Sequence, residues 1–190
     1  METKLVLNIN NFFTLGLFLF LYFNFGNQGL GHDKSLDLPA NKIFGKFKTP
    51  TKEDSEPIGF YSRGCLSGAE KLDDTGEYWQ IMRPARNRNW GHPETIQFTK
   101  DLSKKASEIG WKGLYIGDIS GPRGGPMPYG HQSHQIGLDV DIWMYPPKSL
   151  KLTKNERDKL DFMSVRKDNL KEVNSNWTLN HAKILEAAAK

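Results

Sequence analysis

The sequence predicts an α+β domain, and three of its segments support this fold class. Segment 94–109 has apolar residues at helical spacing, so that one face of a helix is apolar. Segment 114–119 is a short apolar run, which is typical of a buried strand. Segment 138–143 alternates apolar and polar side chains, as a strand with one buried face does. We therefore expect a small, mainly antiparallel sheet that is flanked by helices and long loops and carries the polar residues of a site.

The N-terminal segment has the pattern of a secretory signal peptide. Residues 12–25 form a run of large apolar side chains with few interruptions. A helix of about 14 residues spans only about 21 Å, which is shorter than the hydrocarbon core of a bilayer. We expect residues 1–31 to be a signal peptide that is cleaved before His32, which leaves no membrane span in the mature chain. An uncleaved N-terminal anchor is the alternative.

The exported part is expected to begin with an irregular segment. Residues 32–57 are polar, rich in Lys and interrupted by prolines, so we expect an extended lead-in with little regular structure. The folded domain is expected to cover residues 58–190.

The boundaries of the expected helices have recognisable signals. In segment 94–109, the apolar face consists of Phe98, Leu102, Ala106 and Ile109. Pro93 suits the first position of this helix, and Gly110 suits its end. Further on, Thr153 and Glu156 have the spacing of a capping box, and a last helix is expected to start at Thr178. Segment 121–130 consists mostly of Gly and Pro, which predicts a loop.

Composition narrows the possible classes of protein and of site. The chain has 190 residues, of which 25% are charged, and a formal net charge of +4, so it has neither a disordered nor a multi-span membrane composition. Its Lys and Arg residues are scattered, which argues against a nucleic-acid partner. The mild positive charge fits ordinary solubility, and it also suits an anionic cell-wall polymer. One cysteine, Cys65, excludes both a cysteine-based zinc cage and an intrachain disulfide.

The residues best suited to chemistry lie in segment 131–141. Two histidines, His131 and His134, follow the Gly/Pro loop, and Asp139 and Asp141 lie on one face of the expected strand. A catalytic zinc needs three nitrogen or oxygen ligands and an open position for water. His134 and Asp141 can converge on one ion, and His131 can orient a ligand or contact the substrate. The same spacing also fits a polar loop with capping histidines and solvated aspartates, and a third ligand must come from elsewhere.

The chain resembles the penicillin-insensitive murein endopeptidase family, and the resemblance covers roughly residues 58–190. The longest match combines a Gly/Pro-rich run with the His/Asp segment that follows it. The matching segments are Gly64–Ala69, Gln80–Pro84, Trp90–Pro93, Gly117–Pro126, Gly130–Trp143 and Val165–Asn169.

The resemblance implies an exported, periplasmic zinc peptidase, similar to lysostaphin-type enzymes and D-alanyl-D-alanine peptidases. Such an enzyme cleaves the D-alanyl–meso-diaminopimelyl cross-bridges of peptidoglycan. By the same resemblance, His134 and Asp141 match zinc ligands, His131 matches a neighbouring histidine, and Asp168 matches an acidic residue attributed to a second ion. The candidate substrate contacts are Arg123, Ser133 and Asp139.

One difference from the family pattern leads to a further expectation. The family's remaining zinc ligand lies in a His-x-His motif, whereas the histidine of this chain that follows Asp141 is His181, which we expect on the surface of a helix. We therefore expect the chain to be the N-terminal part of the family's domain, with impaired activity, no assigned catalytic residue and no partner for Cys65. A catalytically inactive remnant that binds peptidoglycan, and a D,D-carboxypeptidase of the same superfamily, are the alternatives.

Overall fold

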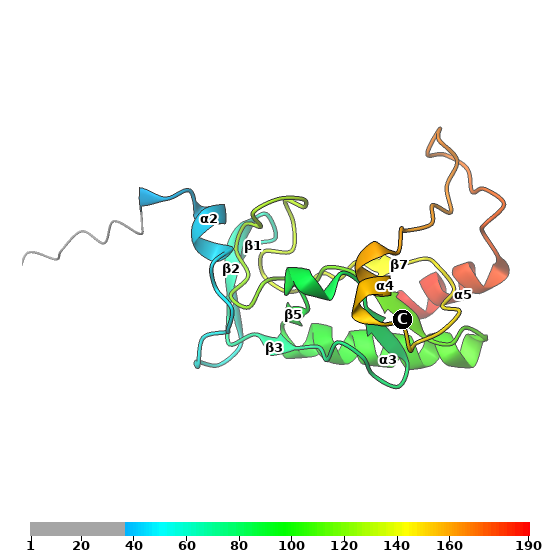
Figure 1. The fold of residues 1–190 in the computed structure, drawn as a ribbon, viewed down its shortest axis with the longest axis horizontal. Coiled ribbons are helices and arrows are strands. Elements are labelled where there is room, and N and C mark those ends of the chain that lie inside the picture. The colour runs from blue at the N-terminus through cyan, green and yellow to red at the C-terminus, as the bar shows by residue number, and fades with distance from the viewer. Residues whose placement is uncertain (1–36) are drawn as a thin grey trace, which may run out of the picture. The chain divides into compact units, whose positions relative to one another are not determined.

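The computed structural model describes residues 37–190, and Figure 1 shows their helices and strands in chain order. The predicted signal peptide, 1–31, lies outside the described residues. In the described part, no helix is both long enough and apolar enough to cross a membrane.

The lead-in contains more regular structure than the sequence predicted. A short helix, α2 (Ala40–Phe44), follows Pro39, and the expectation of an irregular segment was wrong at this point. Strand β1 (Glu56–Phe60) also begins inside the lead-in, and it forms an antiparallel hairpin with β2 (Arg63–Ser67). Ile58 pairs with Cys65 across this hairpin. The strand conformation of β1 therefore depends on hydrogen bonds to β2, which the residues of β1 alone do not reveal.

The remaining strands are short and form two further sheets. A two-stranded antiparallel sheet joins β3 (Glu70–Lys71) to β5 (Trp90–Gly91). The central sheet has the strand order β4-β6-β7, with β4 at Trp79–Ile81, β6 at Leu114–Ile116 and β7 at Ile142–Trp143. Strands β4 and β6 are parallel, whereas β6 and β7 are antiparallel. This combination of small sheets and helices confirms the predicted α+β class.

Helix α3 (Pro93–Ile109) confirms the predicted helix and both of its ends. Pro93 occupies the first turn, His92 caps it by accepting the N–H of Glu94 at 3.3 Å, and Gly110 ends it in the left-handed region at φ 114°. The expected apolar face is correct for Leu102 and Ala106, which are buried. The prediction was wrong for Phe98, which is 42% exposed. Ile96 and the side chains of threonine and serine residues complete the buried face in its place.

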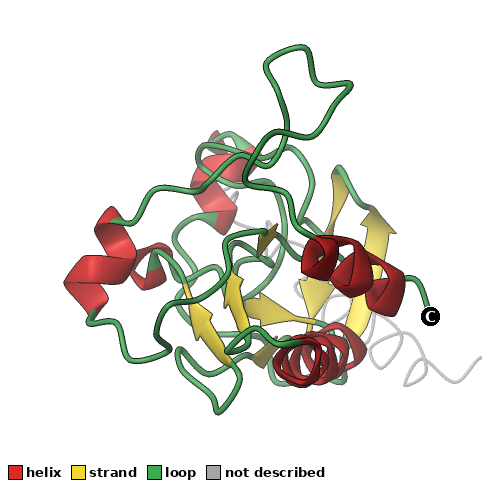
Figure 2. Ribbon diagram, turned by 90° about the vertical axis from the view of Figure 1, so that its right-hand side faces the viewer, coloured by secondary structure: helices red, strands yellow, loops and turns green. Residues whose placement is uncertain are grey.

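Helix α5 (Leu179–Ala188) packs beside α3, as Figure 2 shows, and the two helices enclose the core together with the central sheet. The core unites residues that lie far apart in the sequence. Its buried members are Leu72, Ile81, Ile96, Leu102, Ala106, Trp111, Leu114, Ile116, Ile119 and Ile184. Burying a side chain of this size contributes about 1.5–3 kcal/mol, so this cluster makes the frame that carries the site rigid.

The prediction for His181 was wrong, because this residue is fully buried in the first turn of α5. Its ring contacts Trp111 edge-on and stacks on Trp177. Its Nε2 atom lies 3.1 Å from the carbonyl oxygen of Met144, just after β7. His181 therefore ties α5 to the end of the central sheet.

The strand predicted over 138–143 forms only at its end, as β7. Leu138 is 48% exposed, and residues 138–141 follow an irregular path in which Asp139 contacts His134. Asp141 still joins the sheet edge, because its N–H donates to the carbonyl of Asp118 at 2.9 Å and its carbonyl accepts the N–H of Gly117 at 2.7 Å. The loop over 121–130 is confirmed. Helix α4 (Lys154–Lys159) is confirmed too, together with its capping box.

Candidate metal centre

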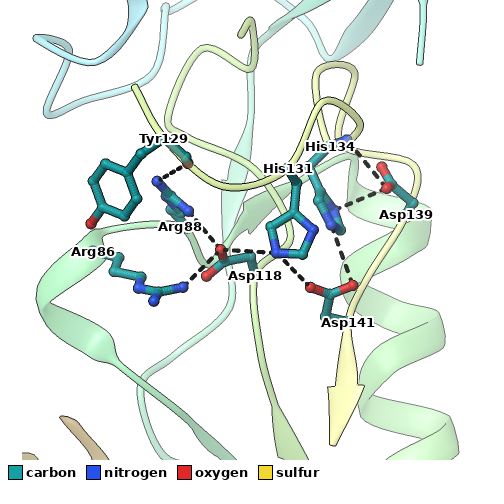
Figure 3. A network of polar contacts seen from close by, with 8 residues as sticks. All are labelled: Arg86, Arg88, Asp118, Tyr129, His131, His134, Asp139 and Asp141. Atoms are coloured by element: carbon teal, nitrogen blue, oxygen red, sulfur yellow. Dashed lines mark hydrogen bonds and ion pairs between the residues drawn. The ribbon is translucent and has the colours of Figure 1, made fainter. Parts of the chain in front are cut away.

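The structure brings His131, His134 and Asp141 together at the edge of the central sheet, as Figure 3 shows. One donor atom from each of the three lies within 4.8 Å of the others. The Nε2 atom of His131 lies 3.3 Å from Oδ2 of Asp141, and Nε2 of His134 lies 3.3 Å from Oδ1 of the same carboxylate. These three side chains are the largest such cluster of His, Cys, Asp and Glu within residues 37–190.

The donor atoms are close enough together to hold one metal ion. A zinc ion with bonds of about 2.0 Å holds neighbouring ligand atoms about 3.3 Å apart. The two nitrogen–oxygen separations have this value, although they run to different oxygens of Asp141, and the three donor atoms as a set lie within 4.8 Å. Two imidazoles with one carboxylate form a donor set that zinc accepts. Three protein ligands leave a fourth position open for water or substrate, which is the arrangement of catalytic sites.

His134 is fixed by its backbone as well as by its ring. It has a left-handed backbone with φ 64°, a conformation that costs energy for a residue other than glycine. The following residue anchors this bend to the β1–β2 hairpin, because the side chain of Gln135 accepts the N–H of Gly64 at 3.1 Å and donates to the carbonyl of Ser62 at 3.0 Å. The hairpin therefore sets the position of the histidine.

The charges around His134 are strongly coupled. Burial alone would lower its pKa, but hydrogen bonds to Asp139 and Asp141, together with their negative charges, raise the pKa of His134 to about 10. Burial alone would raise the pKa of Asp141. The hydrogen bond with His134 and the charges of His134 and His131 outweigh burial, so the pKa of Asp141 is lowered. Without a metal, a protonated His134 therefore neutralises part of the acidic cluster.

The sequence reasoning missed Asp118, which is buried beside the cluster. Its Oδ2 atom accepts from Arg88 at 2.7 Å and from Arg86 at 3.2 Å, and it lies 3.9 Å from Nε2 of His131 (Figure 3). Arg88 also lies over the ring of Tyr129, at 4.4 Å from its centroid. The available signal was a carboxylate directly after a buried strand, which is where a sheet presents site residues.

The other predicted site residues lie in different surroundings. Asp139 is partly exposed and contacts His134, with its Oδ2 at 2.9 Å from Nδ1. Arg123 lies over the ring of Phe47 at 4.1 Å and donates to the carbonyl of Thr49, so the lead-in covers it. Ser133 is partly buried between the two histidines in the chain. Asp168 is exposed in a turn and is not among the clustered donor groups.

A pocket of about 490 Å³ opens over the cluster. Its lining includes Trp143 of β7 together with Asp118, His131 and Asp141 from the segment between β6 and β7. Residues 162–166, Arg83 and Arg86 also line it. The site can therefore admit an extended polar ligand to the metal-binding residues.

The fold and the site define a small α+β domain whose clustered His and Asp side chains face an open pocket. Residues 57–190 match the family model of the penicillin-insensitive murein endopeptidases, and the chain belongs to this family. The predicted resemblance is thereby confirmed.

Curated relatives carry the same name. The chain is 34% identical over 160 residues to a penicillin-insensitive murein endopeptidase of Haemophilus influenzae, a match that covers 82% of this chain and 56% of the relative. It is 40% identical over 104 residues to one of Escherichia coli (strain SMS-3-5), covering 55% of this chain and 38% of the relative. The chain thus spans about half the length of these relatives, or less.

Proposed function

We propose that the chain acts as a zinc-dependent murein endopeptidase that cleaves the D-alanyl–meso-diaminopimelyl cross-bridges of peptidoglycan. The observation that carries the proposal is the convergence of two imidazoles and a carboxylate within 4.8 Å, with His131 and Asp141 lining an open pocket. Family membership supports a murein substrate, and a formal net charge of +4 suits an anionic polymer. We further propose that residues 1–31 direct export to the periplasm.

The proposed roles follow from the positions of the side chains. His134 and Asp141 would hold the ion, and His131 would complete the set from the more exposed side. A bound zinc would lower the pKa of water and polarise a peptide carbonyl. Asp139 keeps the ring of His134 oriented, with Nε2 directed at Asp141, so that the ligand does not have to reorganise. Asp168 remains a proposed ligand of a second ion.

The proposal is tested with purified murein. The full chain, loaded with zinc, is incubated with murein sacculi, and the soluble muropeptides are separated by chromatography. We expect cross-linked dimers to decrease and monomers to increase. A chelator should abolish the change, and His134→Ala should abolish it even with zinc present. Unchanged dimers, with zinc bound and the chain folded, would contradict the proposal.

The same assay separates the two alternatives. Release of free D-alanine, with dimers intact, would identify a D,D-carboxypeptidase. Sedimentation of the chain with sacculi, without any new product, would identify a peptidoglycan-binding protein.

Two smaller measurements test the remaining parts of the proposal. Zinc analysis of wild type and Asp168→Asn determines whether a second ion is held, and a second site requires the variant to lose one ion per chain. A reporter enzyme fused to residues 1–31 tests export, which requires the reporter to reach the periplasm.

A further inference from the structure

Arg83 is a positive charge without an acidic partner in the pocket of the metal centre. It lines the 490 Å³ pocket together with Asp118, His131 and Asp141. The two arginines nearest to it in the sequence, Arg86 and Arg88, each form an ion pair with the single carboxylate of Asp118. The guanidinium of Arg83 forms no ion pair with any carboxylate of residues 37–190. An Arg in this state is free to bind an anion that enters the pocket.

The backbone of Arg83 is held in a conformation that its residue type disfavours. Arg83 has φ 55° and ψ 50°, in the left-handed region that glycine adopts without strain. It also precedes Pro84, and a residue before proline prefers an extended backbone. Its position is fixed nonetheless, because its N–H donates to the carbonyl of Arg157 at 3.3 Å. Strain of this kind is concentrated at functional sites, which directs attention to the side chain that the strained backbone presents.

The side chain of Arg83 contacts Trp143, which lies close to the metal-binding Asp141. Its guanidinium lies 5.5 Å from the centroid of the Trp143 ring. Trp143 and Asp141 are two residues apart, and both pack against the backbone of Gly117. A Cβ atom at Gly117 would lie 3.0 Å from Cβ of Asp141 and 3.1 Å from Nε1 of Trp143. The residue that the guanidinium contacts and the metal-binding carboxylate therefore both lie beside Gly117.

We infer that Arg83 binds a free carboxylate of the peptide substrate and thereby determines specificity. The inference rests on the proposed function, which supplies the chemistry of the ligand. In a diaminopimelyl cross-bridge, the nitrogen of the scissile amide is attached to a carbon that also carries a carboxylate. When the scissile carbonyl lies over the metal centre, that carboxylate lies beside it in the pocket. Arg83 and Arg166 both line the pocket without an ion pair to a described residue, and Arg83 is the one that lies over Trp143, beside the metal-binding carboxylate. A planar guanidinium that lies over the ring of Trp143 is suited to two parallel hydrogen bonds with a carboxylate.

The experiment compares two cross-linked muropeptide dimers. One has a free carboxylate at the diaminopimelyl carbon next to the scissile amide, and the other has a carboxamide there. Their binding to the zinc-loaded full chain is measured by calorimetry under conditions too brief or too cold for turnover, and their cleavage is measured separately. Wild type should prefer the free carboxylate by about 10- to 100-fold, which is the range for hydrogen bonds to a charged group.

Three variants make the result interpretable. Arg83→Gly removes the charge and suits the left-handed backbone, so its melting temperature should not fall, while the preference should disappear. Arg83→Lys keeps the charge without the planar fork and should retain part of the preference. Arg166→Met, at the other arginine that lines this pocket without an ion pair to a described residue, should keep the full preference.

The outcomes separate this inference from the proposed function. If wild type discriminates between the two dimers and Arg83→Gly does not, the inference is supported, even if neither dimer is cleaved and the proposed function fails. If wild type cleaves the dimers but Arg83→Gly discriminates as well as wild type does, the inference is overturned while the proposed function stands. Equal binding of both dimers by wild type also overturns the inference.

Discussion

Asp139 holds the imidazole of His134 from the side opposite the metal-binding cluster. Its Oδ2 atom lies 2.9 Å from Nδ1 of His134 and also accepts the backbone N–H of the same residue at 3.2 Å. Nδ1 faces this carboxylate, and Nε2 is the nitrogen that faces Asp141. A carboxylate in this position fixes the tautomer and the orientation of an imidazole that binds a metal. The two aspartates of the motif therefore have different tasks.

This relationship predicts the effect of Asp139→Asn. The variant keeps the size of the side chain but loses the charge that orients the ring and makes it more basic. We expect the affinity for zinc to fall about 10- to 100-fold, as it does when such a supporting carboxylate is lost. Competition with a chromophoric chelator measures the affinity, and circular dichroism checks the fold.

Asp161→Asn is the matched control for Asp139→Asn. Asp161 is exposed and has no hydrogen bond or ion pair with another described residue, so its variant should bind zinc as wild type does. Equal affinities for wild type and Asp139→Asn would show that Asp139 does not support the ligand.

The raised pKa of His134 predicts how the stability of the metal-free protein depends on pH. The pKa is about 10 in the folded state, compared with an ordinary value of 6.5. The proton on His134 therefore stabilises the folded state fully below pH 6.5, and this contribution is lost as the pH rises through 10. Urea unfolding of wild type and His134→Gln, both in chelator, measures the difference. The stability advantage of wild type should shrink steadily between pH 6.5 and pH 10, and a constant difference would refute the assignment.

The sequence was sufficient for elements whose signals are local. Helix α3 was predicted because Pro93 and Gly110 lie at its own ends, and α4 because its capping box lies within one turn. The central sheet was harder to predict from the sequence, because its parallel pair joins Trp79 to Leu114, which lie far apart in the chain. Strand β7 was predicted too long because the alternating pattern of 138–143 does not reveal that Asp139 turns towards His134.

The candidate site shows the same division between local and distant information. His131, His134 and Asp141 were found because they share one short motif. Asp118 was missed because Arg86 and Arg88, which hold it, come from a different part of the chain. His181 was placed on a helix surface because helical spacing does not show that Trp111 and Trp177 enclose it.

Asp118→Asn should destabilise the protein strongly. Its side chain is 5% exposed and holds two arginines, of which Arg88 is itself buried at 6%. Removal of one partner leaves a buried cation without compensation, which costs about 3–5 kcal/mol. Chemical denaturation measures the free energy of unfolding of the variant and of wild type.

Glu108→Gln provides the comparison for Asp118→Asn, because the ion pair of Glu108 with Lys105 is exposed on both sides. Exposed ion pairs contribute little to the free energy of unfolding, so this variant should be as stable as wild type. Equal stability of both variants would show that the Asp118 network is dispensable.

Gly124→Ala should distort the loop that leads to the two histidines. Gly124 has φ 60°, and a Cβ atom there would lie 2.1 Å from the carbonyl oxygen of Gln135 and 2.7 Å from the backbone nitrogen of Leu66. Both neighbours are backbone atoms, so neither can move aside without displacing the bend at His134 or the β1–β2 hairpin. The strained conformation alone costs about 1–3 kcal/mol. We therefore expect a lower melting temperature together with weaker zinc binding. Gly121→Ala is the matched control, because a Cβ atom there would have only the carbonyl oxygen of Gly124 nearby, at 3.8 Å. If the two alanine variants behave alike, the loop tolerates displacement, and the close approach of Gly124 to Gln135 does not position the metal-binding histidines.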